Sequence, residues 1–282
     1  MSDDRPDIPE PMKREVRQRC GFGCVICGSS IYQYDHMVEW SQLQEHTVEN
    51  LTLLCGTHHD EKTKGLLPLA TVQQANASPI NVRNGVTEPY GLHYGPKAPL
   101  LTVHLGDNKF MAGVSVFPFF VDGDPLIFFQ STDDGVGLYV TLRDDYNRTV
   151  LRIWNNELIH RADLWDVRFE GTTLTVRDAP GDLRLVIRFA PPADVYIERA
   201  KFQYNGVQID VKPTKVTVGG QTMSGSAMIN VGTTVGWVIG DRHPEIESAF
   251  SWQDISRVPV KFGDGPPAVG YRQGVHVTDG SE

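Results

Sequence analysis

The pattern of apolar and polar positions in the first part of the chain predicts a short series of helices and strands. Pro11 favours a helix over residues 12–19, because its fixed φ suits a first helical turn and its missing N–H needs no partner there. Two runs rich in Tyr, Ile, Val and Leu predict strands over residues 31–38 and 51–54. The polar residues 39–49 between them predict a loop.

Two more helices are expected after the second strand, one over residues 58–64 that ends at Gly65 and one from Pro68 to about residue 77. Residues 78–98 are rich in Pro and Gly, which is the composition of a linker. The first part of the chain therefore has the order helix, strand, loop, strand and helix.

The pattern changes from about residue 100 onward. Short runs of β-branched and aromatic residues are separated by turn signals, of which Asn205-Gly206 is a strong hairpin turn. This texture predicts an all-β domain, either a sandwich or a barrel. A β-solenoid is the alternative, disfavoured because no fixed repeat is visible.

The fold class expected from these patterns is α+β. A small module, residues 10–77, would be joined by the linker, residues 78–98, to an all-β recognition or regulatory domain, residues 99–263. Residues 264–282 are expected to form a flexible tail.

The composition is that of a folded, water-soluble protein: 282 residues, of which 40% are apolar and 22% charged. No apolar run approaches the roughly 20 residues that a membrane-spanning helix needs. Residues 1–10 are acidic and proline-rich, unlike a signal peptide. We therefore expect a cytoplasmic protein with reduced thiols and no membrane partner.

All four cysteines lie in the first fifth of the chain, which in a reducing compartment indicates a metal before a disulfide. Cys24-x-x-Cys27 and Cys55-x-x-His58 supply four ligands as two paired turns, the usual construction of a structural zinc site. Such a Zn²⁺ would stabilise a fold too small to have much core. Cys20 is interpreted as a small buried residue, with a spare zinc ligand as the alternative.

The segment from about Cys20 to Gly65 resembles the HNH endonuclease family of the ββα-metal class. The resemblance rests on the cysteine pair, Asp35-His36, Asn50-Leu-x-Leu-Leu-Cys55, His58-His59 and Lys62-Thr63. The usual family version has a fourth cysteine where this chain has His58, which is itself an ordinary zinc ligand. The resemblance implies a small zinc-stapled ββα module.

The resemblance also implies a role for each matching residue. Hydrolysis of a phosphodiester needs an activated water and stabilisation of the charge on the phosphate and on the leaving oxygen. His36 is the implied general base, and Asp35 and His59 would hold one catalytic Mg²⁺ or Mn²⁺. Asn50 would restrain the loop that carries His36, and Lys62, one helical turn beyond His59, is a candidate phosphate contact.

The net charge of −9 is unusual for an enzyme that binds a polyanion. Lys13, Arg14, Arg17 and Arg19 form the one basic cluster, which fits either a strip that follows a phosphate backbone or a solvated helix face. A weakly basic module should bind nucleic acid poorly by itself. We therefore expect activity to depend on homo-oligomerisation, or on an unknown ligand or protein sensed by the β domain.

Three alternatives accompany this interpretation. The zinc module could bind nucleic acid or protein without catalysis, although such a module has no need of Asp35, His36 and His59. The spacing Cys20-x-x-x-Cys24-x-x-Cys27 also matches the iron–sulfur loop of radical enzymes, which would leave the second ligand pair unexplained. The β domain could be a carbohydrate or protein binder for which the nuclease module is incidental.

Two further groups of residues have a functional and a structural interpretation. His46 could approach the catalytic metal, but its polar surroundings favour a solvated side chain. Four tryptophans could form a stacking platform, but residues of this kind more often fill a β core: Trp154, Trp165, Trp237 and Trp252.

The sequence thus predicts a metal-dependent endonuclease that hydrolyses phosphodiester bonds in nucleic acid. Double-stranded DNA is the favoured substrate, and RNA is left open. A nuclease fused to a β domain suits bacterial antiviral defence or a mobile element, by analogy alone.

Overall fold

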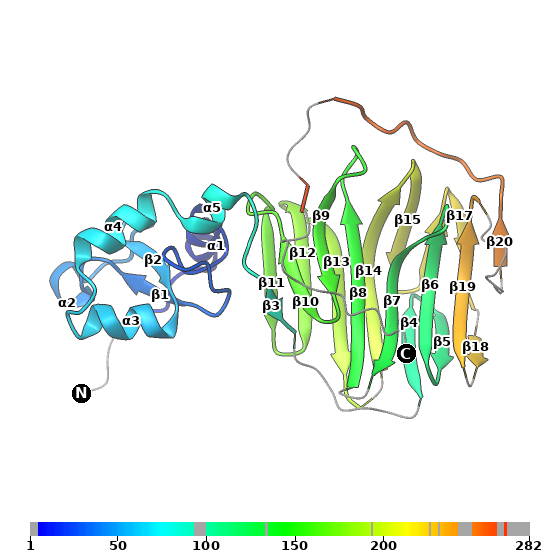
Figure 1. Cartoon of the computed structure of the whole chain (residues 1–282), viewed down its shortest axis with the longest axis horizontal. Helices are drawn as coiled ribbons and strands as arrows, with labels where there is room; N and C mark the ends of the chain where they lie inside the picture. The colour runs from blue at the N-terminus through cyan, green and yellow to red at the C-terminus, as the bar shows by residue number, and fades with distance from the viewer. Residues whose placement is uncertain are drawn as a thin grey trace, which may run out of the picture.

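The structure, a computed structural model, is α+β: a small mixed module at one end of the molecule and a large β-sandwich at the other (Figure 1). It describes residues 5–92, 100–132, 135–192, 194–225, 227–230, 232–241, 250–263 and 268–269. Within these ranges every helix is too short or too polar to cross a bilayer. The tail expected over residues 264–282 lies outside the described residues, except for 268 and 269.

Two short strands and the helices around them build the module on a small apolar core. The strands β1 and β2 pair antiparallel, with Gln33 opposite Leu54 and His36 opposite Leu51. Every residue of β2 is buried, whereas β1 is buried only at its last two positions. The bounds are α1 Glu10–Arg19, β1 Gln33–His36, α2 Trp40–Leu43, β2 Leu51–Leu54, α3 Gly56–Thr63, α4 Leu69–Ala77 and α5 Ile80–Asn84.

The predicted elements of the module are confirmed, with one correction. The polar stretch 39–49, predicted as a loop, contains the four-residue helix α2. The stretch has too few apolar residues to show a helical pattern, so its sequence does not indicate this helix. The helix is held by Trp40, because the ring of Trp40 packs on His36 and His46. Cys20 is fully buried in the core, as predicted.

The chain passes from the module into the sandwich through residues 78–92, part of the expected linker. These residues carry α5 and the short strand β3 (Tyr90–Gly91), which pairs with β10. The buried side chain of Asn81 donates hydrogen bonds to Gly21 O at 3.0 Å and to Gly28 O at 3.1 Å, so α5 is packed on the module.

The sandwich consists of two open sheets, which confirms the first of the predicted all-β architectures. In the described residues, one sheet has the strand order β20-β19-β6-β7-β8-β9-β10-β3. Its strands, besides β3, are β6 Ser115–Val121, β7 Asp124–Thr132, β8 Gly135–Arg143, β9 Thr149–Trp154, β10 Glu157–His160, β19 Thr233–Ile239 and β20 Phe250–Trp252.

The second sheet runs in the order β11-β12-β13-β14-β15-β16-β17, with β4 beside β14, β5 beside β4 and β18 beside β5. Its strands are β4 Leu101–Leu105, β5 Asn108–Ala112, β11 Asp166–Glu170, β12 Thr173–Ala179, β13 Asp182–Ala190, β14 Asp194–Tyr204, β15 Val207–Lys212, β16 Lys215–Val218, β17 Gln221–Met223 and β18 Ala227–Asn230.

The core lies between the two sheets. Phe110 of one sheet meets Trp237 of the other edge to face at 5.0 Å, and Phe119 lies 6.2 Å from Phe202 across the same interior. The predicted burial of the tryptophans holds for Trp237, which fills the core. Trp154, at the end of β9, is instead 46% exposed. Trp154 meets Tyr139, on the neighbouring strand β8, ring edge to ring face.

The module is docked on one end of the sandwich by polar contacts. Arg17 of α1 reaches Asp166 of β11 with Nε at 3.2 Å and Nη2 at 3.1 Å from Oδ1, and both side chains are buried. Gln18 donates to Trp165 O at 2.6 Å. The module and the sandwich are therefore joined by more than the connecting chain.

Candidate active site and metal centre

The four residues predicted to bind zinc come together beside β2. Cys24 and Cys27 lie in the turn before β1, Cys55 joins β2 to α3, and His58 is in the first turn of α3. Their ligand atoms all lie within 4.8 Å of one another. His58 Nδ1 is 3.4 Å from Cys24 Sγ and 3.2 Å from Cys55 Sγ, and the Sγ atoms of Cys27 and Cys55 are 3.8 Å apart. Zinc–sulfur bonds of about 2.3 Å give a tetrahedron with edges of about 3.8 Å, so the four atoms fit one zinc ion.

Backbone hydrogen bonds shape the turn that presents the first two thiols. The Cys24 N–H donates to Ser29 O at 2.9 Å, and the Gly28 N–H donates to Cys24 O at 2.7 Å. Gly28 has a φ of +79°, a conformation that residues with a Cβ rarely adopt. The Val25 N–H donates to Leu53 O of β2 at 3.0 Å, which fixes the turn beside the strand that leads to the other two ligands.

Asp35 and His59 face each other next to this cluster. Asp35 is the third residue of β1, and His59 follows His58 of the cluster on α3. His59 Nε2 lies 3.5 Å from Asp35 Oδ1. Because His58 and His59 are consecutive on one helix, any metal that fixes the first also fixes where the second points.

The Asp35 carboxylate has the features of a ligand for a hard divalent cation. It is buried, and its Oδ2 accepts no hydrogen bond although it lies 3.0 Å from Lys62 Nζ. A buried carboxylate oxygen that accepts no hydrogen bond is costly, and a bound cation would add to the charge that Lys62 supplies. Burial raises the pKa of Asp35 above its ordinary value, even though Lys62 and His59 oppose the shift. A carboxylate is a suitable ligand for Mg²⁺ or Mn²⁺, and the imidazole of His59 would add one nitrogen ligand beside it.

Lys62, which the sequence suggested as a phosphate contact, is almost buried and makes its hydrogen bonds within the protein. Only 8% of its side chain is exposed. Its ammonium group donates to His36 O at 2.7 Å, to Glu39 Oε1 at 2.9 Å and to Asp35 Oδ1 at 3.3 Å. Lys62 therefore ties α3 to the end of β1 and balances two carboxylates.

His36 projects to the other side of β1 from Asp35, as consecutive strand residues do. Its Nδ1 lies 2.7 Å from Arg5 Nη2, and its Nε2 lies 3.0 Å from His46 Nδ1. Burial, followed by the positive charge of Arg5, lowers the pKa of His36 to about 4. The imidazole is therefore neutral near pH 7, the form that a general base requires.

Sequence reasoning missed both partners of His36. His46 was expected to be solvated, but it lies against the imidazole of His36. Arg5 was not singled out, and no local signal could have found it, because 31 positions separate it from His36. Only the folded chain brings the N-terminal segment to this side chain.

Asn50 holds the chain that leaves β1. Its Oδ1 accepts from the Val38 N–H at 2.7 Å, and its Nδ2 donates to Val38 O at 2.9 Å. Its backbone carbonyl also accepts from the Met37 N–H at 2.8 Å. The two residues after His36 are thus tied to Asn50, which is the geometry that a restraining role requires.

The four basic residues of α1 do not form a continuous strip. Arg17 is buried in the contact with the sandwich, and Arg19 donates to two backbone carbonyls beside β2. Lys13 pairs with an acidic residue one turn earlier at 3.4 Å, and Arg14 lies over a tryptophan ring of the sandwich at 4.2 Å. Docking of the module on the sandwich uses Arg14 and Arg17, two of the four positive charges that the sequence suggested for phosphate.

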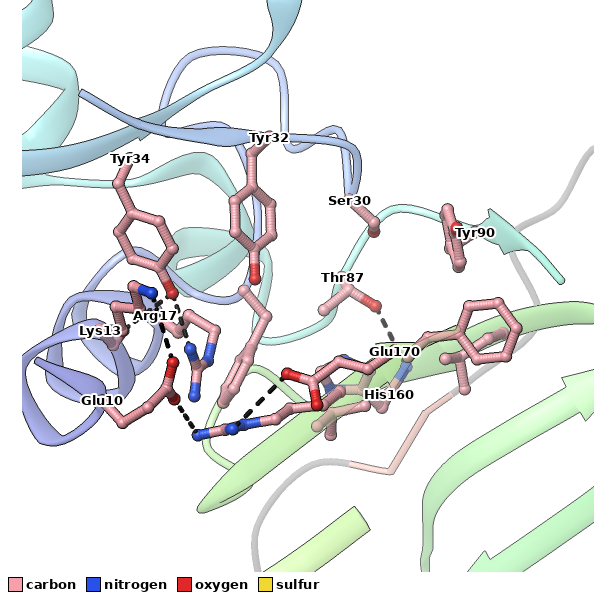
Figure 2. Close-up of a pocket in the computed structure, with 15 residues that line it drawn as sticks. Glu10, Lys13, Arg17, Ser30, Tyr32, Tyr34, Thr87, Tyr90, His160 and Glu170 are labelled. Atoms are coloured by element: carbon pink, nitrogen blue, oxygen red, sulfur yellow. Dashed lines mark hydrogen bonds and ion pairs between the residues drawn. The ribbon is translucent and has the colours of Figure 1, made fainter. Parts of the chain in front are cut away.

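A cavity of about 320 Å³ lies where the module meets the sandwich (Figure 2). The hydroxyls of Tyr32 and Tyr34 point into it. Each charged residue that lines it has an opposite charge nearby; Arg168, for example, lies 2.8 Å from Glu10 and 3.6 Å from Glu170. The positive side chains of the lining are therefore already paired with acidic groups, which disfavours a phosphate there.

Comparison with known proteins gives one match. Residues 18–65 match the family model described as HNH endonuclease. No curated protein and no solved structure matches the chain. The matched span contains the complete cysteine and histidine cluster together with Asp35, His36, Asn50 and His59. The segment from residue 18 to residue 65 is therefore a domain of the HNH endonuclease family.

Proposed function

We propose that the protein is a metal-dependent endonuclease that hydrolyses phosphodiester bonds in nucleic acid, with double-stranded DNA as its substrate. One observation carries the proposal: the buried Asp35 carboxylate, with an oxygen that accepts no hydrogen bond, faces His59 beside the Cys24, Cys27, Cys55 and His58 cluster. A purely structural zinc knuckle has no use for a second donor pair at this position.

Asp35 and His59 are the residues that would hold the catalytic Mg²⁺ or Mn²⁺. Bound there, the cation would stabilise negative charge on the phosphate and on the leaving oxygen. His36 accepts a proton from the attacking water. Asn50 fixes the backbone after His36, and Lys62 holds the carboxylate of Asp35 toward α3.

The acidic sandwich fits a role in controlling the module. The Arg17–Asp166 contact sets the orientation of α1 and consumes a positive charge that could otherwise meet a phosphate. We propose that a ligand of the sandwich, or assembly of several chains, alters this docking and so changes the affinity for nucleic acid.

The test is a cleavage assay with the full chain on supercoiled, linear and single-stranded substrates, with Mg²⁺, Mn²⁺ or EDTA. Wild type should nick or linearise DNA only when the divalent cation is present. His36→Ala should abolish cleavage without changing zinc content or melting temperature. The matched control is His104→Ala, since His104 lies in the sandwich, paired with Asp194 at 2.7 Å.

Two results would reject the proposal. Wild type that binds DNA but cuts no substrate with either cation would indicate a zinc-dependent binding module. Equal cleavage by wild type and His36→Ala would remove His36 from the role of general base.

A further inference from the structure

The imidazole of His36 is held between two polar neighbours. Its Nε2 lies 3.0 Å from His46 Nδ1, and His46 Nε2 lies 2.8 Å from Pro6 O. On the opposite edge of the ring, Arg5 Nη2 lies 2.7 Å from His36 Nδ1. Trp40 packs against both histidine rings, with centroids 5.4 Å and 4.6 Å away.

These contacts determine where the ring protons are. A backbone carbonyl can only accept, so His46 carries a proton on Nε2, which it donates to Pro6 O. A guanidinium can only donate, so Nδ1 of His36 is the bare nitrogen that accepts from Arg5. A neutral His36 then has its proton on Nε2, and His46 Nδ1 is the atom that accepts it.

We propose that His46 is a positioning residue for His36. By accepting the Nε2–H, His46 holds the plane of the His36 ring and keeps the proton on Nε2 when water replaces Arg5 at Nδ1, so that Nδ1 is the nitrogen that accepts the proton of the water. The proposal rests on the proposed function, because it takes His36 to be the base, and it assigns a task to a histidine that the HNH resemblance leaves without one.

The proton of the attacking water is transferred to His36, while His46 keeps its hydrogen bond to the same ring. The O–H bond of the attacking water breaks, its proton forms an N–H bond at Nδ1, and the oxygen keeps the electron pair with which it attacks phosphorus. The Nε2–H bond stays in place throughout. The positive charge that develops on His36 is stabilised because His46 Nδ1 continues to accept that N–H. Water takes the place at Nδ1 that Arg5 occupies in this structure.

The local fold holds His46 in place for this task. Helix α2 ends at Gln44, whose left-handed φ of +54° turns the chain back toward β1. The other end of the same loop is anchored at Asn50, which is bonded to Val38. His46 is therefore carried by a loop closed at both ends, with Trp40 packed against its ring.

The first experiment reads the tautomer directly, on the full-length protein with ¹⁵N-labelled histidine. Ring ¹⁵N chemical shifts at neutral pH, assigned with His36→Ala, should show His36 protonated at Nε2 and bare at Nδ1. His46→Asn places an amide oxygen near the position of the accepting Nδ1 and should keep this tautomer. In the Arg5→Ala background, where no guanidinium keeps Nδ1 bare, His46→Leu removes the acceptor and should give a mixture of tautomers, whereas His46→Asn should not.

The second experiment measures cleavage of plasmid DNA by the same variants. His46→Leu should lower kcat by about 10- to 100-fold and leave KM within about twofold, because the base is misaligned while substrate contacts are untouched. His46→Asn should recover most of the lost kcat, which a merely structural side chain would not require. Zinc content and circular dichroism, equal to wild type, confirm that each variant is folded.

The outcomes separate this inference from the proposed function. A wild-type His36 protonated at Nδ1, an Arg5→Ala/His46→Leu variant that keeps the Nε2–H tautomer, or a His46→Leu variant with the wild-type kcat overturns the role of His46 while the nuclease stands. The expected tautomers in a protein that cleaves nothing would retain the histidine pair and reject the nuclease. If the variants with leucine at position 46 are misfolded, the comparison of Arg5→Ala/His46→Asn with Arg5→Ala still decides, because loss of the Nε2–H tautomer in the double variant contradicts the proposal.

Discussion

Arg17 and Asp166 form a buried ion pair between the HNH module and the sandwich, with two guanidinium nitrogens 3.1 Å and 3.2 Å from the same carboxylate oxygen. The two residues are 149 positions apart. Removing charges from water is costly, and the cost is recovered only while both partners are present. The pair therefore makes the orientation of the module depend on a close match between two distant surfaces.

Removal of one residue of this ion pair should lower the stability of the protein. Asp166→Ala leaves the buried Arg17, and also Arg168 at 2.9 Å, without this counter-charge and is expected to lower the free energy of unfolding by about 3–5 kcal/mol, measured by urea denaturation. Asp210→Asn, in an exposed pair with Lys212, is the control and should cost less than about 1 kcal/mol. Similar small losses in both variants would show that the pair does not stabilise the contact.

Zinc should be needed for folding of the module. Cys27→Ala is expected to abolish zinc binding and unfold residues 10–77, because the ion joins the turn before β1 to α3. Cys20→Ala, which changes a buried cysteine outside the cluster, should keep one zinc per chain. Metal analysis and circular dichroism give the answer, and an unchanged zinc content in Cys27→Ala would disprove the ligand assignment.

The ammonium group of Lys62 and a divalent cation should stabilise the same carboxylate. Lys62→Met leaves Asp35 and Glu39 without their shared positive charge, so this variant should melt at a lower temperature than wild type. Added Mn²⁺ should raise its melting temperature more than that of wild type, because the cation supplies the missing charge.

Lys64→Met is the matched control for Lys62→Met, since Lys64 follows at the end of the same helix in an exposed pair with Asp60. Its melting temperature and its response to Mn²⁺ should equal those of wild type. An equal or smaller response to Mn²⁺ in Lys62→Met would mean that Asp35 is not a cation ligand.

Arg5 occupies the nitrogen through which His36 would act. Arg5→Ala is expected to raise the cleavage rate several-fold, because water then reaches Nδ1 without displacing a guanidinium. Arg83→Ala, an exposed arginine on α5, is the control and should leave the rate unchanged. A lower rate for Arg5→Ala would show instead that the guanidinium holds the substrate phosphate.

His160 should make the contact between the module and the sandwich sensitive to acid. It is buried beside Phe22, with ring centroids 5.2 Å apart, and burial lowers its pKa to about 4. Between pH 6.5 and 4 the unfolded chain takes up a proton at this histidine and the folded chain does not. The free energy of unfolding therefore contains the full contribution of the neutral ring above pH 6.5. It falls by about 3 kcal/mol as the pH drops to 4.

The comparison that isolates this effect is with His160→Asn, whose amide can still donate to Arg161 O, as Nδ1 of His160 does at 2.8 Å. Unfolding free energies of both proteins, measured from pH 7 to 4, should converge as the pH falls. Parallel curves would mean that His160 does not contribute to the acid sensitivity.

Much of the module could be predicted because its signals are local. The ligands Cys24 and Cys27, and likewise Cys55 and His58, are three residues apart, so a single turn presents each pair. The spacing alone therefore predicts the cluster. The burial of all of β2 also follows from short-range pattern.

The surroundings of His36 depended on contacts that no short window contains. Arg5 lies 31 positions before His36 and His46 lies 10 positions after it, in a stretch that the polar composition predicted as an open loop. The same holds for Arg17, whose charge suggested phosphate binding but is paired with Asp166 of β11.

The sequence by itself determined the type of metal cluster, the order strand, strand and helix around it, and the β character of the rest. These depend on residue types at fixed short spacings and on alternating polarity, which act within one or two turns of chain. Only the tertiary structure decided which nitrogen of His36 carries the proton, that Lys62 is buried, and that Arg14 and Arg17 of α1 meet the sandwich. Those outcomes are set by desolvation and pairing of charges brought together from distant parts of the chain.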